Sequence, residues 1–194
     1  MAGRDAAGFR GELDRALRGR GAELRGALVA GVLNRYLPKG RRAVLVGGAL
    51  VSFYTNGAYT TADVDLVGDR EAVASLLRGA GFEESGRYFA DKTLGLVVEV
   101  PGAVLRPTET VLMATVEGYA VPLLAPEDAL VDRLLAAKYW KSVTDWEQAI
   151  LLWATLRDRF EAADLRRKAE ANEVADLLDE LNRMPSAAPT GRRA

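Results

Sequence analysis

The stretch from Ala43 to Val67 limits the possible folds more than any other part of the sequence. A short apolar run, Ala43–Val46, is typical of a buried strand, and it stops at two consecutive glycines, Gly47 and Gly48. The chain then continues to an alternating segment, Asp63-Val64-Asp65-Leu66-Val67. Because side chains alternate between the two faces of a strand, both carboxylates lie on one face. A glycine turn beside two acids predicts a site for phosphate and metal.

The composition removes most other kinds of catalytic chemistry. The 194 residues include no histidine and no cysteine. Their absence excludes disulfides, thiol nucleophiles, the Ser-His-Asp arrangement and the usual zinc sites. Carboxylates, lysine, arginine, hydroxyls and backbone amides remain. These groups suit a hard cation bound through oxygen ligands, such as Mg²⁺.

Charge and hydropathy indicate an ordinary soluble protein. Hydrophobic residues make up 49% of the chain and charged residues 27%, with a net charge of −1. The net charge gives no overall basic field for nucleic acid, although arginines gather locally near residues 10–25, 41–42 and 166–168. No apolar run approaches the roughly 20 residues that span a bilayer, and the N-terminus lacks a secretory signal pattern. We therefore expect a cytoplasmic protein with no membrane association.

Apolar periodicity divides the chain into helical and strand-rich parts. We expect an N-terminal helical lead-in at residues 1–40, a catalytic core at 41–124, a helical region at 125–184 and a disordered tail at 185–194. The expected helices cover residues 5–18, 21–36, 49–54 and 70–79, and further helices follow from residue 126, with one amphipathic segment at 162–184. The expected strands cover residues 43–46, 63–67, 94–100, 110–116 and 119–123, and residues 82–92 are expected to form a strand or a hairpin arm. The fold class is α/β (α+β), with a mixed twisted sheet flanked by helices.

A third acid, Glu99, interrupts the apolar run Leu94–Val100. Phosphoryl and nucleotidyl transfer require positioned phosphates whose charge is neutralised, usually by Mg²⁺ bound to carboxylates. Asp63, Asp65 and Glu99 could hold one or two such ions if their strands are neighbours. The alternative is that the aspartates stabilise a turn and that Glu99 is a solvent-facing charge on an edge strand.

These residues resemble a known group of enzymes. The glycine pair Gly47-Gly48, followed by Asp63-Val64-Asp65 and a later strand acid at Glu99, is similar to the signature of the nucleotidyltransferase superfamily, whose fold is shared with DNA polymerase beta. Two residues of the helical region, Lys138 and Asp145, are similar to the lysine and aspartate motifs of AbiEii and MenT-type nucleotidyltransferase toxins.

The resemblance implies a role for each matching residue. Gly47 and Gly48 would bind the triphosphate, and Asp63 and Asp65 would ligate magnesium. Glu99 would be the third metal ligand and would help to deprotonate the incoming hydroxyl. Lys138 would neutralise phosphate charge, and Asp145 would orient it or bind the nucleotide. Local alternatives stay open: Lys138 as a helix lysine with its charge in solvent, and Asp145 as a helix-terminus acid.

The resemblance also implies a reaction. A nucleoside monophosphate would pass from a nucleoside triphosphate such as ATP to an acceptor hydroxyl. The acceptor would be RNA, such as a tRNA end, and the protein would act in a toxin-antitoxin or phage-defence system. One alternative is nucleotidylation of a partner protein. Another is a catalytically degenerate binding or antitoxin subunit, because Ala49 follows the glycine pair where relatives often carry a hydroxyl. Tyr54 and Tyr59 could stack on a base.

Overall fold

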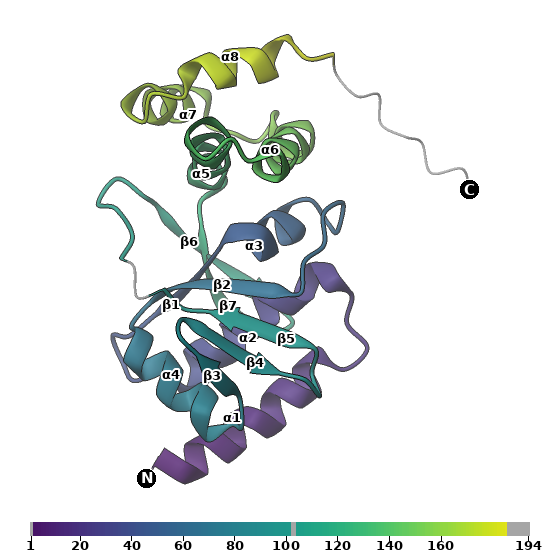
Figure 1. Ribbon diagram of the computed structural model, residues 1–194, viewed down its shortest axis with the longest axis vertical. Helices are drawn as coiled ribbons and strands as arrows, with labels where there is room; N and C mark the ends of the chain where they lie inside the picture. The colour runs from purple at the N-terminus through teal and green to yellow at the C-terminus, as the bar shows by residue number, and fades with distance from the viewer. Residues whose placement is uncertain (1, 102–103, 186–194) are drawn as a thin grey trace, which may run out of the picture. The chain divides into compact units, whose positions relative to one another are not determined.

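The computed structural model describes residues 2–101 and 104–185. The chain divides into two compact units at Ala125 and Pro126. All strands among the described residues lie in the first unit, and the second unit is helical (Figure 1).

The first unit contains a seven-stranded mixed sheet with the order β3-β4-β5-β2-β1-β7-β6. Strand β2 is parallel to β5 and β1 is parallel to β7, whereas the other neighbours are antiparallel. The strands are β1 Ala43–Val46, β2 Asp63–Gly68, β3 Glu83–Ser85, β4 Tyr88–Asp91, β5 Leu96–Glu99, β6 Val111–Val116 and β7 Tyr119–Leu124. The predicted mixed sheet is therefore confirmed, and the segment at 82–92 is a hairpin of two strands.

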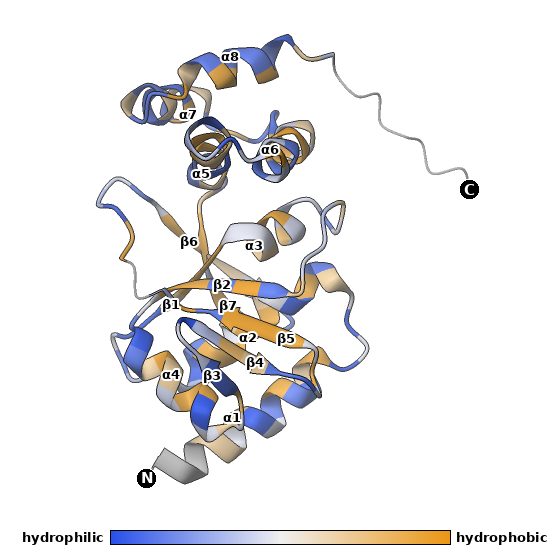
Figure 2. Ribbon diagram, in the orientation of Figure 1, coloured by the Kyte–Doolittle hydropathy of each residue, from blue (hydrophilic) through white to orange (hydrophobic). Residues whose placement is uncertain are grey.

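The register of β2 and β5 follows from the alternation in their sequences. Asp63 is paired with Val97 and Asp65 with Glu99, while Val64 pairs with Val98 between them. Val64 and Val98 are buried. Because Val64 and Val98 enter the core, Asp63, Asp65 and Glu99 must lie on the opposite face of their strands. Figure 2 shows the apolar character of the central strands.

Four helices accompany the sheet: α1 Ala2–Leu17, α2 Ala22–Tyr36, α3 Gly47–Tyr54 and α4 Arg70–Gly79. Helix α2 packs against β7 and β1, and α1 packs on α2 and α4. The apolar stripe of α2, including Leu28, Val32 and Leu33, is fully buried, as its spacing predicts. Helix α3 lies so close to α2 that a Cβ on Gly26 would be 2.6 Å from the Cβ of Ala49. The sequence of α2 thus sets the position of the helix that follows the glycine turn.

Asp91 at the end of β4 connects the N-terminal helix to the sheet. Its side chain is almost fully buried and accepts hydrogen bonds from Thr93 Oγ1 at 2.6 Å, from the Leu94 N–H at 2.9 Å and from Arg10 of α1. Burial opposes ionisation of Asp91, but these hydrogen bonds outweigh it and lower its pKa below the ordinary value of 3.8. The ionised carboxylate therefore contributes to stability.

We expect Asp91→Asn to lower the free energy of unfolding by about 1–3 kcal/mol at neutral pH. A carboxyl group with a lowered folded pKa stabilises the protein above its unfolded pKa and loses that contribution as the pH falls through the folded value. The difference between wild type and variant should therefore shrink below pH 3.8. Urea unfolding of both proteins, from neutral pH to below pH 3.8, measures this difference in the free energy of unfolding.

Asp14→Asn is the control, because it removes the more exposed partner of Arg10, at 3.1 Å. It should lower the free energy of unfolding by about 0.5 kcal/mol or less. Equal losses for the two variants would contradict the anchoring role of Asp91.

The second unit consists of α5 Pro126–Tyr139, α6 Val143–Leu156, α7 Ala162–Ala171 and α8 Ala175–Arg183. Its core includes an ion pair in which Lys168 Nζ lies 2.6 Å from Asp128 Oδ1, with both side chains buried. The prediction of a single amphipathic segment at 162–184 is wrong, because the helix is interrupted between α7 and α8. Glu173 adopts a left-handed conformation there with φ 58°, and the Val174 N–H bonds back to the Ala169 carbonyl. The predicted disordered tail lies, beyond Pro185, outside the described residues.

Within residues 2–101 and 104–185, no helix has both the length and the apolar character to cross a bilayer.

Candidate functional site

The glycine turn and the acidic strand meet in the first unit. Gly47 begins α3 with φ 65°, a left-handed conformation that favours glycine. A Cβ at this position would lie 1.9 Å from Asp65 Oδ2, so a side chain is excluded by space as well as by backbone conformation. The next residue, Gly48, donates its backbone N–H to Asp65 Oδ2 at 3.3 Å. The turn and one predicted metal ligand are therefore in direct contact.

Asp63 differs from Asp65 in its surroundings. Asp65 is half-buried, whereas Asp63 is exposed at the start of β2. The Asp63 N–H donates to Thr61 Oγ1 at 3.1 Å, which fixes the backbone where the strand begins. Among the described residues, the Asp63 carboxylate has no hydrogen-bonding or ionic partner. Its oxygen atoms are thus accessible to a cation from solvent.

Glu99 lies beside Asp65 in the register of the parallel pair β2 and β5. Its side chain is 21% exposed and forms an ion pair with Arg87, with 3.0 Å between Nε and Oε1. Arg87 also interacts electrostatically with Asp65. In the described part of the chain, no three acidic side chains converge in a geometry that would hold a metal ion. The structure thus brings the Glu99 position to the site but gives its carboxylate a cationic side chain as partner.

Sequence reasoning missed Arg87. This residue precedes Tyr88, which is opposite Glu99 in the antiparallel pair β4 and β5. Only the hairpin register identifies the neighbour of Glu99, and that register cannot be read from the spacing of Arg87 and Glu99. The Arg87 side chain is 55% exposed, so it can also reach a ligand in solvent.

The two tyrosines considered for base stacking have different environments. Tyr54, at the end of α3, donates its hydroxyl to the Leu124 carbonyl at 2.7 Å and is thereby attached to β7. The ring of Tyr59 lies next to the glycine turn, because a Cβ on Gly48 would be 3.3 Å from Tyr59 Cε1. Of the two, Tyr59 is the one beside the candidate site.

Lys138 and Asp145 are both in the second unit, where each has another partner. Lys138 Nζ donates to Asp176 Oδ1 at 2.8 Å and to the Glu173 carbonyl, and the hydrogen bond to Asp176 raises the pKa of Lys138. Asp145 Oδ1 accepts from Arg133 at 2.6 Å. The Asp145 N–H donates to Ser142 Oγ at 3.2 Å, so Ser142 caps the N-terminus of α6. Asp145 occupies the first turn of that helix, as the helix-terminus alternative predicts. Arg133 was not identified from the sequence, because it precedes Asp145 by 12 residues in another helix.

The residues present fit a magnesium ion. Mg²⁺ is commonly held by one or two carboxylates together with substrate phosphates, and it retains several waters. The Asp63 carboxylate is exposed, and Asp65 is on the same face of β2 beside backbone amides suited to phosphate. These two side chains would hold the ion.

Sequence comparison identifies no relative: no family model matches the chain, and no curated protein sequence matches it. Comparison of structures does find matches. One is the crystal structure of an antigenic nucleotidyltransferase-like protein from Paracoccidioides brasiliensis, with a TM-score of 0.50 and 21% identity over 81% of this chain and 92% of the other.

Another is the solution structure of the antibiotic-resistance factor ANT(2'')-Ia, with a TM-score of 0.50 and 16% identity over 82% of this chain and 94% of the other. The chain has a nucleotidyltransferase fold. At these identities the likeness concerns the fold alone. The resemblance to AbiEii and MenT-type toxins stays a prediction.

Proposed function

We propose that this protein is a Mg²⁺-dependent nucleotidyltransferase, with its reaction site at Gly47, Gly48, Asp63 and Asp65. The observation that carries the proposal is the contact between the glycine turn and the acidic strand, in which the Gly48 N–H donates to Asp65 Oδ2. Backbone amides suited to phosphate and carboxylates suited to Mg²⁺ are thus adjacent in a nucleotidyltransferase fold. Transfer of a nucleotidyl group needs this combination.

In the proposed reaction, an acceptor hydroxyl oxygen forms a bond to the α-phosphorus of a nucleoside triphosphate. The bond between the α-phosphorus and the oxygen bridging to the β-phosphate breaks, and pyrophosphate leaves. Mg²⁺, when bound, neutralises phosphate charge. The glycine turn positions the triphosphate through backbone amides, and Asp63 and Asp65 position the phosphates by holding the ion. The hydroxyl proton passes to a carboxylate or to water.

The acceptor we propose is RNA. The last two residues of α5 and the first two of its connection to α6 read Lys138-Tyr139-Trp140-Lys141, with Tyr139 52% and Trp140 81% exposed. Aromatic side chains next to cations are the common means of binding single-stranded nucleic acid, because every base can stack on an aromatic ring. This run supports an RNA end as acceptor, and a toxin or phage-defence role would follow from modifying such an end.

Labelled nucleoside triphosphate tests the proposal directly. The protein is incubated with Mg²⁺, each of the four triphosphates, total RNA and a protein extract, and the products are separated by size. Label in an RNA band supports the proposed acceptor. Label in a protein band would instead identify protein nucleotidylation. If no label is transferred and calorimetry detects no Mg²⁺-dependent binding of any triphosphate, the proposal is lost.

A second candidate, a catalytically degenerate nucleotide-binding subunit, is favoured by the Arg87–Glu99 ion pair. An arginine on the third acid competes with a second metal ion for that carboxylate. Ala49, which follows the glycine pair, also supplies no hydroxyl to a phosphate. Under this reading the protein binds a triphosphate without transferring it.

We expect Arg87→Gln to raise Mg²⁺-dependent triphosphate affinity about two- to fivefold, because the Glu99 carboxylate becomes free for metal. Calorimetry with a non-hydrolysable triphosphate measures the change. Arg78→Gln is the matched control, since Arg78 is similarly exposed and pairs with Glu71 and Glu84. A lower affinity in Arg87→Gln alone would mean that Arg87 itself binds the triphosphate, contrary to this prediction.

A further inference from the structure

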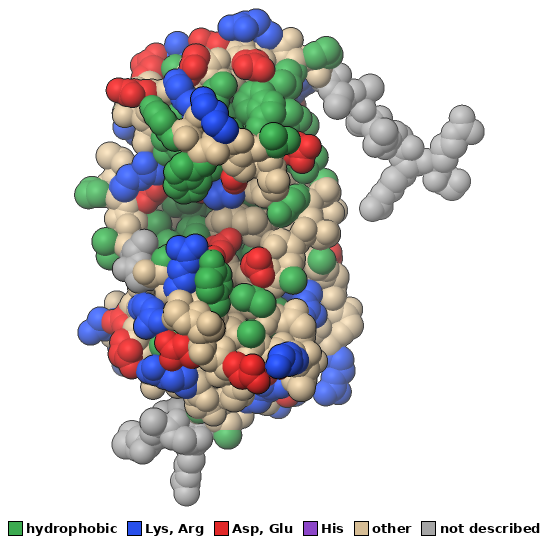
Figure 3. Space-filling view, in the orientation of Figure 1, with side chains coloured by type: hydrophobic (Ala, Val, Ile, Leu, Met, Phe, Trp, Pro, Cys, Tyr) green, Lys and Arg blue, Asp and Glu red, His purple; other side chains and the backbone are tan. Residues whose placement is uncertain are grey.

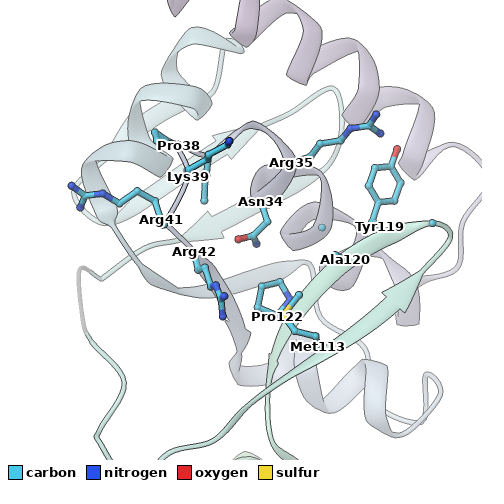
Figure 4. Close-up of a pocket in the computed structure, with 14 residues that line it drawn as sticks. Asn34, Arg35, Pro38, Lys39, Arg41, Arg42, Met113, Tyr119, Ala120 and Pro122 are labelled. Carbon is cyan, nitrogen blue, oxygen red and sulfur yellow. The ribbon is translucent and has the colours of Figure 1, made fainter.

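A pocket of about 660 Å³ lies in the first unit, at the end of β1 opposite to the glycine turn. The C-terminal turn of α2, the loop at residues 38–42 and the β6–β7 hairpin form its walls (Figure 4). Arg42 immediately precedes β1 and Gly47 immediately follows it, so the length of the strand separates this pocket from the proposed reaction site. A ligand in this pocket would therefore contact it through a group other than the reacting phosphates.

Four cations line the pocket, and two of them lack a neutralising partner among the described residues. Arg35 pairs with Glu12 at 2.7 Å, and Arg41 pairs with Asp69. For Lys39 and Arg42, the described part of the chain provides no ion pair and no side-chain hydrogen bond. None of the described residues that line the pocket is acidic. An anionic ligand would therefore meet two unneutralised positive charges.

The other polar side chains at the pocket are already satisfied. Asn34 donates to the Ala30 and Ala43 carbonyls at 2.7 Å each and accepts from the Ala43 N–H at 3.0 Å. Glu12 accepts from Tyr36 at 2.7 Å and from Tyr119, in addition to Arg35. These contacts fix the wall, so the charged ends of Lys39 and Arg42 remain as the groups that select a ligand.

The remaining surface of the pocket is apolar and accessible. Met113 of β6 lines the pocket and is 56% exposed. Pro122 and Ala120 of β7 complete this side of the pocket (Figure 4). In the view of Figure 3, by contrast, acidic and basic side chains are intermixed over the first unit. A local pair of unneutralised cations beside an apolar wall suits a phosphodiester chain, which combines charged phosphates with less polar sugars and bases.

We propose that this pocket binds backbone phosphates of the nucleic-acid acceptor at a distance from the reacting hydroxyl. The proposal rests on the proposed function, because it assigns the acceptor of that reaction. Lys39 and Arg42 contact phosphate oxygens, and Met113 and Pro122 contact the sugar or base that follows. This binding needs neither the triphosphate nor Mg²⁺.

Binding of labelled tRNA, without triphosphate or metal, tests the proposal. We expect Lys39→Gln/Arg42→Gln to weaken binding about tenfold at roughly 0.1 M salt, because two phosphate contacts are lost. The slope of log affinity against log salt should decrease in magnitude by about 1.4–1.8. The matched control, Arg18→Gln/Lys92→Gln, removes two exposed cations elsewhere in the first unit and should keep the wild-type affinity and slope. Equal binding by wild type and Lys39→Gln/Arg42→Gln overturns the proposal.

Two further measurements separate the remaining explanations. Lys39→Arg/Arg42→Lys retains both charges and should bind tRNA as wild type does; weak binding by this variant as well would overturn an electrostatic role. If the glutamine variant loses affinity for free pyrophosphate but not for tRNA, the pocket serves a small phosphate compound, and the acceptor assignment is overturned. Mg²⁺-dependent triphosphate binding should be unchanged in all these variants. If the wild type shows no Mg²⁺-dependent triphosphate binding, the proposed function is contradicted. The comparison of tRNA binding between wild type and variants still tests the pocket.

Discussion

Asp63→Asn and Asp65→Asn should each lower nucleotidyl transfer by about 100- to 1,000-fold. Each substitution removes a negative charge from the proposed metal site while it retains the shape of the side chain. Losses of this size are typical when one electrostatic contact to a reacting centre is removed. The measured quantity is the initial rate of label transfer from triphosphate to RNA under saturating Mg²⁺.

The controls for these variants separate chemistry from folding. Asp158→Asn changes an aspartate of the second unit that is 92% exposed, and it should retain the wild-type rate. The thermal midpoint of Asp63→Asn should equal that of the wild type, because the Asp63 carboxylate is exposed and lacks a partner in the described structure. A rate for Asp63→Asn within about threefold of wild type would show that this carboxylate is not a ligand of a catalytic ion.

Gly47→Ala should lower the free energy of unfolding by about 3 kcal/mol and should also abolish triphosphate binding. A left-handed conformation costs a non-glycine residue about 1–2 kcal/mol. The Cβ would in addition lie 1.9 Å from Asp65 Oδ2, so the carboxylate must move. Urea unfolding gives the stability and calorimetry gives the affinity.

Gly19→Ala is the matched control for Gly47→Ala. Gly19 has φ 70°, and a Cβ at this position would have no atom within 4 Å. Its substitution therefore isolates the cost of the backbone conformation, about 1–2 kcal/mol, with triphosphate binding unchanged. Equal losses of stability for the two variants would contradict the close approach of Asp65 to the glycine turn.

The local structure of the site could be predicted from the sequence because it depends on neighbouring residues. The apolar run before Gly47 predicts β1 with the bounds that are observed, and Asp69 with Gly79 predicts the limits of α4. The alternation Asp63-Val64-Asp65 likewise predicts which face carries the acids, because the apolar residue between them must enter the core.

The rest of the site depends on contacts between distant parts of the chain. The position of Glu99 next to Asp65 requires β5 to pair in parallel with β2, and the position of Arg87 requires the register of β4 on β5. No local pattern determines either pairing. The break at Glu173 was also missed, because the amphipathic pattern continues across it. The local signal for the break is Asn172, a residue type suited to helix ends.

Strand β1 determines a further property of the proposed reaction. Its four residues, at roughly 3.3 Å each, place the basic pocket and the glycine turn about 13 Å apart. An extended strand that is hydrogen-bonded on both sides can neither stretch nor shorten appreciably. With the triphosphate at the glycine turn and the acceptor's backbone phosphates in the basic pocket, the modified hydroxyl would thus lie a set length along the acceptor from its bound phosphates. Under the proposed function, the protein would select its target by distance along the acceptor, and the base sequence between the two points could vary freely.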